Sequence, residues 1–198
     1  MIPVEILEQF GAKEIQLAKG DFLFKEGQYA KNYYQLSSGE LKMNNYTEDG
    51  NEFIQAIFSK NESFGEPPLF GDFTYPANAE ALTDCKLLSL KKEDLFELLK
   101  KNPEIHLEVL KSIAQRLYYK AKMAVEISNH QAGHRILTLI DFLKDREGGT
   151  FEKYTYEVEL TRKQIGDLTG LRTETVIRAM KALEKESEIE IRERKVFR

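Results

Sequence analysis

Residues 159–185 combine polar and charged side chains at spacings that could bind a ligand; they read ELTRKQIGDLTGLRTETVIRAMKALEK. Thr161 and Gln164 have the T-x-x-Q spacing of a capping box, which starts a helix by satisfying two free backbone N–H groups. Gly170 can adopt the positive φ of a tight turn, and a second helical pattern begins near Arg172. A brief helix, a glycine turn and a second helix in this order predict a helix-turn-helix.

The second predicted helix has an apolar face and a polar face. Val176, Leu183 and either Ala179 or Met180 recur at helical spacing and form the buried side. On the polar side, an arginine can bind guanine bidentately in the major groove, and a glutamate can accept a hydrogen bond from cytosine N4. We therefore expect the following residues of this helix to contact DNA: Arg172, Thr173, Glu174, Thr175, Arg178 and Lys181.

The start of the first predicted helix is suited to hold a phosphate. Thr161, Arg162 and Lys163 bring hydroxyl, cationic and backbone N–H groups to one helix N-terminus. The whole chain has a net charge of -4, yet residues 161–185 hold six basic and three acidic side chains. A local basic face on an acidic chain fits a small DNA-contacting element, although charge alone is equally typical of a solvated helix surface.

Two short alternating segments follow the second helix. Residues 189–191 (IEI) and 195–197 (KVF) flank the polar stretch 192–194 (RER). This pattern predicts a small β-hairpin that would form a wing beside the helix-turn-helix. The wing strengthens the interpretation as a DNA-binding element.

Residues 14–90 have the two-residue period of short antiparallel strands. Apolar and polar residues alternate in segments such as 15–17 and 41–43, and residues 48–51 (EDGN) predict a hairpin turn. Glycines punctuate this region at positions 20, 27, 39, 50, 65 and 71. The pattern predicts an antiparallel sandwich or barrel.

The pattern becomes helical after residue 90. Residues 91–100 predict a short helix, and Asn102-Pro103 predicts the start of a long helix that ends near Ser128. This long helix contains a heptad seam of small and apolar residues: Leu110, Ala114, Leu117, Ala121, Ala124 and Ser128. We expect the seam, within residues 103–128, to pair with a second copy of the chain. The alternative is that the helix lies on its own sheet.

The chain is thus expected to be of the α+β class, with three parts. A domain of antiparallel strands spans residues 1–101, and a dimerisation helix with a hinge spans residues 102–130. A winged helix-turn-helix domain spans residues 131–198. The hinge is expected at residues 129–133, before a helix over residues 134–146 that ends at Gly148-Gly149.

Cysteine and histidine usage excludes several kinds of site. A single cysteine, Cys85, rules out an intramolecular disulfide, a multi-thiolate zinc site and a four-cysteine iron–sulfur cluster. It lies in an apolar segment and is expected to be an inert core thiol. His130 and His134 have the spacing of a metal pair, but no third ligand is evident and no histidine lies in residues 1–103. We expect no metal, no cofactor and no enzymatic activity, and an enzyme of cupin type is disfavoured for the same reason.

The chain has no feature that would direct it to a membrane. The N-terminus, MIPVE, lacks the basic and apolar regions of a signal peptide. No run approaches the ~20 apolar residues that a membrane helix needs. We expect a cytoplasmic protein.

Residues 160–178, LTRKQIGDLTGLRTETVIR, resemble the signature of the CRP/FNR family of bacterial transcription regulators. Residues 64–66 (FGE), followed by Leu69-Phe70, are similar to the phosphate-binding cassette of that family, and residues 81–85 are similar to the strand after it. The resemblance covers nearly the whole chain. It implies a jelly-roll sensor domain, a dimerisation helix from Pro103 and a winged helix-turn-helix.

The resemblance also assigns base-reading positions. Glu174 and Arg178 fall on two such positions of the family. Thr173 falls on a third, where many members carry arginine, so the DNA sequence that is read can differ. Arg172 is the neighbouring residue that could compensate.

The predicted sensor domain departs from the cyclic-nucleotide binders of the family. Those members hold the phosphate with an Arg-Ser pair after the cassette, where this chain has residues 75–77 (YPA), and no arginine precedes Arg116. A buried phosphate needs a compensating cation and hydrogen-bond donors. Gly65 and Glu66 remain the candidate ligand-binding residues, with Glu66 serving either a ligand hydroxyl or the local turn. We expect an effector other than a cyclic nucleotide, or none.

The sequence thus predicts a homodimeric, sequence-specific regulator whose partners are double-stranded DNA and a second copy of the chain. RNA polymerase and an unidentified small-molecule effector are further candidate partners. The alternative function is a ligand-binding jelly-roll module whose winged helix binds another protein.

Overall fold

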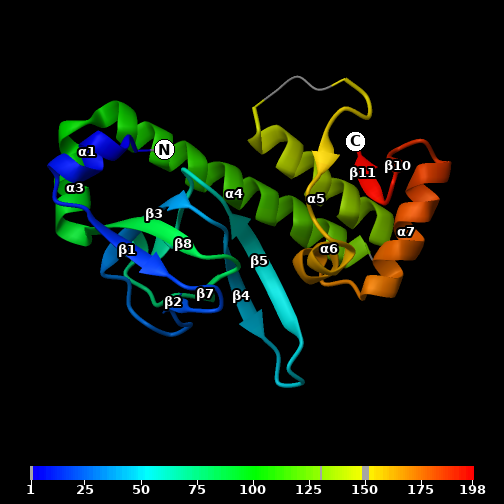
Figure 1. Ribbon diagram of the computed structural model, residues 1–198, viewed down its shortest axis with the longest axis horizontal. Coiled ribbons are helices and arrows are strands. Elements are labelled where there is room, and N and C mark those ends of the chain that lie inside the picture. Colours follow the sequence, from blue (N-terminus) through cyan, green and yellow to red (C-terminus); the bar gives the residue numbers. More distant parts are fainter. Residues whose placement is uncertain (1, 130, 149–151) are drawn as a thin grey trace. The chain divides into compact units, whose positions relative to one another are not determined.

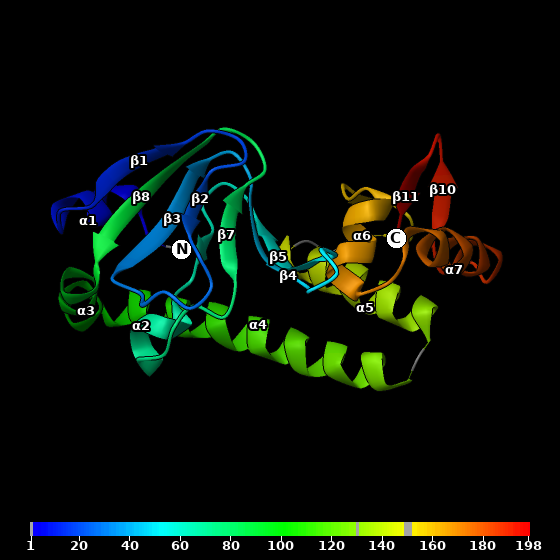
Figure 2. The same ribbon diagram turned by 90° about the horizontal axis from the view of Figure 1, so that it is seen from below.

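The computed structural model describes residues 2–129, 131–148 and 152–198, which form two compact units, Met1–Gln115 and Arg116–Arg198. The first unit holds most of the strands (Figure 1). The second holds the C-terminal helices and a small sheet (Figure 2). The α+β class expected from the sequence is confirmed.

The first unit is built on two four-stranded antiparallel sheets. One contains, in spatial order, β1 (Lys13–Leu17), β8 (Cys85–Lys91), β3 (Asn32–Ser38) and β6 (Ser63–Phe64). The other contains β2 (Phe22–Phe24), β7 (Asn78–Ala81), β4 (Leu41–Tyr46) and β5 (Glu52–Phe58). Apart from β4 and β5, which pair directly around the predicted turn at residues 48–51, strands that are consecutive in the sequence lie in different sheets, as in an antiparallel roll.

Two apolar cores stabilise this unit. The first lies between the inner faces of the sheets, where Leu36, Leu41 and Leu87 are fully buried. The second lies under four helices and includes Leu7 and Leu95. Burial of apolar side chains is the main favourable term in folding, so each core holds its layer in place.

The helices of the second core are α1 (Val4–Gln9), α3 (Lys92–Lys101), the start of α4 (Pro103–Asn129) and α2 (Pro67–Gly71), which contributes Leu69. The sequence analysis predicted α3 and α4 but not α1, nor the five-residue helix α2. The Asn102 Nδ2 group donates a 2.8 Å hydrogen bond to the Leu98 carbonyl. Asn102 therefore closes the end of α3 just before α4 begins.

Helix α4 has a buried side and an exposed apolar side. Ile105, Val109 and Met123 are buried. The six residues of the heptad seam are all exposed, and Leu117 is 67% exposed. None of the helices in the described ranges has the length and apolarity that a membrane crossing requires.

The second unit contains the predicted helix-turn-helix and wing. Helix α5 (Ala132–Arg146) packs on α6 (Arg162–Thr169) and α7 (Thr173–Lys185). Strands β10 (Glu190–Arg192), β11 (Lys195–Phe197) and β9 (Glu157–Val158) form a sheet in the order β10-β11-β9, and only β9 was not expected. Figure 2 shows the β10–β11 hairpin standing beside α7.

The connection between α4 and α5 differs from the predicted hinge. Asn129 is the last residue of α4, and Ala132 and Gly133 belong to α5 because its helical hydrogen bonds begin before His134, so the first and the last two of the predicted hinge residues are helical. His130, in that hinge, and Gly149, in the predicted stop after the helix, lie outside the described residues.

Candidate nucleic-acid interface

A reciprocal cap fixes the start of α6. The Thr161 hydroxyl oxygen accepts a 3.2 Å hydrogen bond from the Gln164 N–H, and Gln164 Oε1 accepts a 2.9 Å bond from the Thr161 N–H. Gly170 has φ +67° and its N–H donates to the Gly166 carbonyl, which ends the helix. The capping box and the glycine turn are thus both confirmed.

Helix α7 buries one face and exposes the other. Val176, Met180 and Leu183 are buried, so Met180 rather than the half-buried Ala179 completes the apolar stripe. The opposite face carries exposed side chains at helical spacing: Glu174, Ile177, Arg178 and Lys181. This arrangement leaves one continuous surface of α7 open to a partner.

The cations on α7 are available for such a partner. Arg172 lies exposed at the N-cap position, and Arg178 and Lys181 are exposed within the helix. Within the described ranges, none of the three forms an ion pair. Thr173 and Thr175, by contrast, are half-buried and present less of their side chains.

The candidate phosphate-binding residues of α6 have partners within the domain. The Thr161 side chain is occupied in the helix cap. Half-buried Arg162 donates from Nη2 to the Arg194 carbonyl at 3.2 Å, and burial lowers the pKa of its guanidinium from the ordinary value. Lys163 Nζ lies 2.7 Å from Asp167 Oδ2, although the lysine side chain remains 69% exposed. Of this group, Lys163 is the side chain that still reaches the surface.

The wing turns tightly at its tip. Strands β10 and β11 pair Arg192 with Lys195, so Glu193 and Arg194 alone form the turn. Their φ values, +47° and +68°, are those of the two central residues of a type I′ turn. The bond from Arg162 to the Arg194 carbonyl ties this tip to α6.

Sequence analysis did not single out two exposed residues of this surface. Ile177 is 42% exposed and lies one helical turn from both Glu174 and Lys181. The sequence could have indicated this exposure, because Ile177 lies three residues from Glu174 and four residues from Lys181 and so shares their face of the helix. Arg194 stands exposed at the wing tip, and its position depends on the strand register, which the sequence pattern left open.

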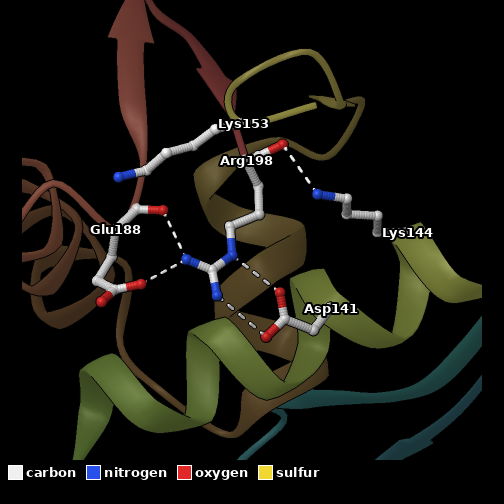
Figure 3. A pocket seen from close by; sticks show the side chains of 5 residues that line it. All are labelled: Asp141, Lys144, Lys153, Glu188 and Arg198. Atoms are coloured by element: carbon white, nitrogen blue, oxygen red, sulfur yellow. Dashed lines mark hydrogen bonds and ion pairs between the residues drawn. The ribbon is translucent and has the colours of Figure 1, made fainter. Parts of the chain in front are cut away.

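A charged surface pocket of about 300 Å³ lies on the same unit (Figure 3). The Arg198 guanidinium reaches into it, donating from Nε to Asp141 Oδ1 at 2.9 Å and from Nη1 to the Glu188 carbonyl at 2.7 Å. The hydrogen bond with the Asp141 carboxylate, together with the Glu188 carboxylate, raises the pKa of Arg198. The chain thus fills this pocket with its own ion pairs, which fasten the segment after β11 to α5.

The candidate ligand-binding residues of the roll are covered by the protein's own side chains. Gly65 and Glu66 are buried, and the Ser63 hydroxyl donates to Glu66 Oε1. The rings of Phe24 and Tyr75 stack with centroids 3.6 Å apart. A Cβ on Gly65 would lie 3.1 Å from each ring. The aromatic pair therefore lies directly on the predicted cassette.

Tyr75 is buried in this apolar roll at the place where the resemblance predicts a phosphate-binding pair. Its hydroxyl makes no hydrogen bond within the described residues. Burial, with smaller contributions from Tyr34 and Glu66, raises the pKa of this hydroxyl. A neutral phenol at this place offers no cation to a buried phosphate.

The remaining candidate ligands for metal or redox chemistry are dispersed. Cys85 is buried, its thiol lies 3.1 Å from the Glu40 carbonyl, and burial raises the thiol pKa. His134 Nδ1 lies 3.8 Å from Glu126 Oε2, whereas His130 is outside the described residues. In the part of the chain that is described, no three His, Cys, Asp or Glu side chains gather as a metal site would require.

Comparison with known protein families matches both units. The model for the cyclic nucleotide-binding domain matches residues 14–102, and the model for the Crp-like helix-turn-helix domain matches residues 134–198. Two matches within the sequence thus cover the roll and the winged helix separately.

Individual relatives extend the match over most of the chain. The transcriptional activator protein Anr of Pseudomonas aeruginosa is 27% identical over 176 residues, which cover 88% of this chain and 72% of the relative. The cAMP-activated global transcriptional regulator CRP of Pasteurella multocida is 28% identical over 164 residues, which cover 82% of this chain and 78% of that relative. The solved structure of the c-di-GMP responsive global regulator CLP of Xanthomonas campestris has a TM-score of 0.72 at 20% identity and covers 98% of each chain. FixK2 of Bradyrhizobium japonicum has a TM-score of 0.71 at 21% identity, and the alignment covers 94% of this chain and 91% of FixK2. The two structural matches share the fold.

Proposed function

Because this chain belongs to the CRP/FNR family of bacterial transcription regulators, we propose that it is a homodimeric, sequence-specific DNA-binding regulator and not an enzyme. The observation that carries the proposal is the exposed face of α7, where Glu174, Arg178 and Lys181 stand together above a buried apolar stripe. We propose that it acts in the cytoplasm on double-stranded DNA, with RNA polymerase as a further partner.

The proposed mode of binding places α7 in the major groove. Glu174 accepts from cytosine N4 and Arg178 donates to guanine O6 and N7, the pairings that geometry favours for these side chains. Phosphates on either side of the groove are contacted by Arg172, Lys163 and Lys181. Thr173 and Thr175 lie at the start of α7, near the DNA backbone. Arg194 brings the wing tip to the neighbouring phosphates.

The proposed dimer pairs α4 of one chain with α4 of a second copy. The exposed heptad seam supplies the contact, since its alanines and serine let two helix backbones approach closely. The functional parts would then be the roll over residues 1–101, the dimerisation helix over 102–130 and the DNA-binding domain over 131–198. Two recognition helices related by a two-fold axis would enter successive major grooves about 34 Å apart.

The proposed sensor does not bind a cyclic nucleotide. No arginine precedes Arg116, and Tyr75 with Phe24 covers the cassette at Gly65 and Glu66. A cyclic nucleotide phosphate would be buried there without a cation. The effector of this chain, if it uses one, is therefore a molecule without a phosphate.

Selection of the ligand-free protein against a random duplex library tests the proposal. The expected result is an inverted repeat with half-sites about one helical turn apart. In the same selection, Arg178→Ala should weaken specific binding by about 1–3 kcal/mol and relax one base position. Failure to enrich any sequence, together with DNA affinity that does not fall with salt, would favour a winged helix that binds protein.

A further inference from the structure

Arg135 lies in the first turn of α5 and is only 8% exposed. Its two terminal nitrogens point to different helices. Nη1 donates to the Thr169 carbonyl of α6 at 3.1 Å, and Nη2 donates to the Ile127 carbonyl of α4 at 3.3 Å. One side chain thus links three helices of the second unit.

Both acceptors lie at helix C-termini. Thr169 is the last residue of α6, and Ile127 lies in the last turn of α4. The aligned peptide dipoles make the C-terminal end of a helix electronegative, so a cation is favourable at both positions. A planar guanidinium with separated N–H groups can satisfy both at once, which a lysine ammonium on one flexible stem cannot do with the same geometry.

Stability alone is a weak reason for a buried arginine here. Both partners are neutral carbonyls, and Arg135 Nε is buried without a hydrogen bond in the described ranges. Desolvation of a guanidinium is costly, and well-packed apolar residues often replace buried charged groups without loss of stability. We therefore attribute the presence of Arg135 to the geometry it imposes, since it holds the ends of α4 and α6 at fixed positions relative to α5.

Neighbouring contacts make the start of α5 a junction. A Cβ on Gly133 would lie 3.3 Å from Leu183 Cδ2, so the α5 backbone passes directly beneath α7. Further along, Tyr119 of α4 stacks on Phe142 of α5 with ring centroids 4.0 Å apart. Helix α5 therefore touches the end of α4 and both helices of the helix-turn-helix.

We propose that Arg135 is a positioning residue that fixes the angle between the end of α4 and the helix-turn-helix, and thereby the spacing between the two DNA half-sites. The inference rests on the proposed function, because α4 must join the two copies for the angle to set a distance between recognition helices. Arg135 itself touches no DNA in this arrangement. Its loss should change the tolerated spacing and leave the half-site sequence unchanged.

The experiment uses the full-length protein and duplexes that contain the selected half-sites separated by spacers of different length. Each added base pair moves the half-sites apart by about 3.4 Å and rotates one around the axis. The wild type should prefer one spacing. Arg135→Met fills a similar volume but loses both hydrogen bonds of the guanidinium. Its preference for the best spacing over the next-best spacing should fall by at least about tenfold, which is the effect of losing a single hydrogen bond that involves a charged group.

Two further variants separate positioning from folding. Arg135→Lys can reach one carbonyl and should restore part of the spacing preference. Leu139→Ala removes a buried side chain of α5 that has no hydrogen-bonding group, so it should lower the thermal midpoint and keep the wild-type spacing preference. Circular dichroism checks that each variant is folded, and Arg135→Lys provides the comparison if Arg135→Met is not.

The outcomes distinguish this inference from the proposed function. A wild-type protein that enriches no half-site overturns the proposed function. A wild type with one preferred spacing that Arg135→Met and Arg135→Lys both retain overturns the positioning role. The positioning role is also overturned if Leu139→Ala widens the range of tolerated spacings as much as Arg135→Met does.

Discussion

Gly166 of α6 lies directly beneath the carbonyl oxygen of Leu171, so close that a Cβ on Gly166 would stand 2.6 Å from that oxygen. The Leu171 N–H in turn donates to the Gly166 carbonyl at 2.9 Å. The turn between the two helices can fold onto α6 only because residue 166 has no side chain. This contact sets the short distance between the end of α6 and the start of α7.

Replacing Gly166 with alanine should therefore destabilise the DNA-binding domain. In an ordinary helix interior, alanine is more stable than glycine by about 0.5–1 kcal/mol. Here the backbone carbonyl cannot yield as a flexible side chain could, and we expect a loss of about 1–3 kcal/mol from overpacking. Urea unfolding measures the change. Gly133→Ala meets only the flexible end of Leu183 at 3.3 Å and should cost less; equal losses at both sites would contradict the argument.

Releasing Lys163 from Asp167 should strengthen DNA binding. The carboxylate lies 2.7 Å from the lysine ammonium and brings a negative charge to the proposed phosphate-binding end of α6. Asp167→Asn removes that charge, so affinity at low salt should rise and the slope of log affinity against log salt should steepen by up to about 1. Fluorescence anisotropy over a salt series measures both. In the Lys163→Ala background the same substitution should leave the slope unchanged.

Ile177 should contribute to base preference through apolar contact. It is exposed beside Arg178 on the face of α7 that is proposed to enter the major groove, where the thymine C5-methyl group is the apolar feature of the bases. Ile177→Ser should reduce the preference for a thymine at one position of each half-site and leave the guanine preference of Arg178 intact. Sequencing of selected duplexes compares the two profiles. An unchanged thymine frequency would place Ile177 outside the groove.

A charge on the α4 seam should separate the proposed dimer. Leu117→Glu places two carboxylates against each other across the two-fold axis, in a seam that otherwise carries no charge. Sedimentation velocity should show a monomer, and affinity for the full inverted repeat should fall towards that for one half-site. Gln115→Glu adds the same charge at another exposed position of α4, off the seam, and should remain dimeric. A dimeric Leu117→Glu protein would place the interface elsewhere.

Removing the Tyr75 hydroxyl should stabilise the roll. That hydroxyl is buried without a hydrogen bond in the described residues, and such a group costs about 1–3 kcal/mol. Tyr75→Phe should therefore raise the free energy of unfolding by about 1 kcal/mol. Tyr33→Phe is the control, since the Tyr33 hydroxyl is buried and donates to Gln35 Oε1 at 2.8 Å, and its removal should destabilise. A loss of stability in Tyr75→Phe would show that the hydroxyl has a partner in solution.

The local elements followed from the sequence because their causes are local. The cap at Thr161, the turn at Gly170 and the buried stripe with Val176 depend on residues within a few positions of one another. The strands were predicted by their period, but their distribution between two sheets depends on contacts between distant segments.

The residues that sequence analysis missed act across such distances. Arg135 satisfies carbonyls on two other helices, and Gly166 approaches a carbonyl beyond the next turn. Neither role is marked by a motif in the surrounding residues. The Tyr75 ring was recognised as a departure from the expected phosphate site, whereas its stacking on Phe24 required the folded roll.

The exposed seam of α4 has a consequence for how such a regulator responds to its own abundance. Where dimers are the DNA-binding form and monomers predominate, the concentration of dimer rises with the square of the monomer concentration, by mass action. A twofold change in synthesis would then produce about a fourfold change in the binding species. The amount of DNA-binding dimer would thus follow the rate of synthesis more steeply than the amount of the chain itself does.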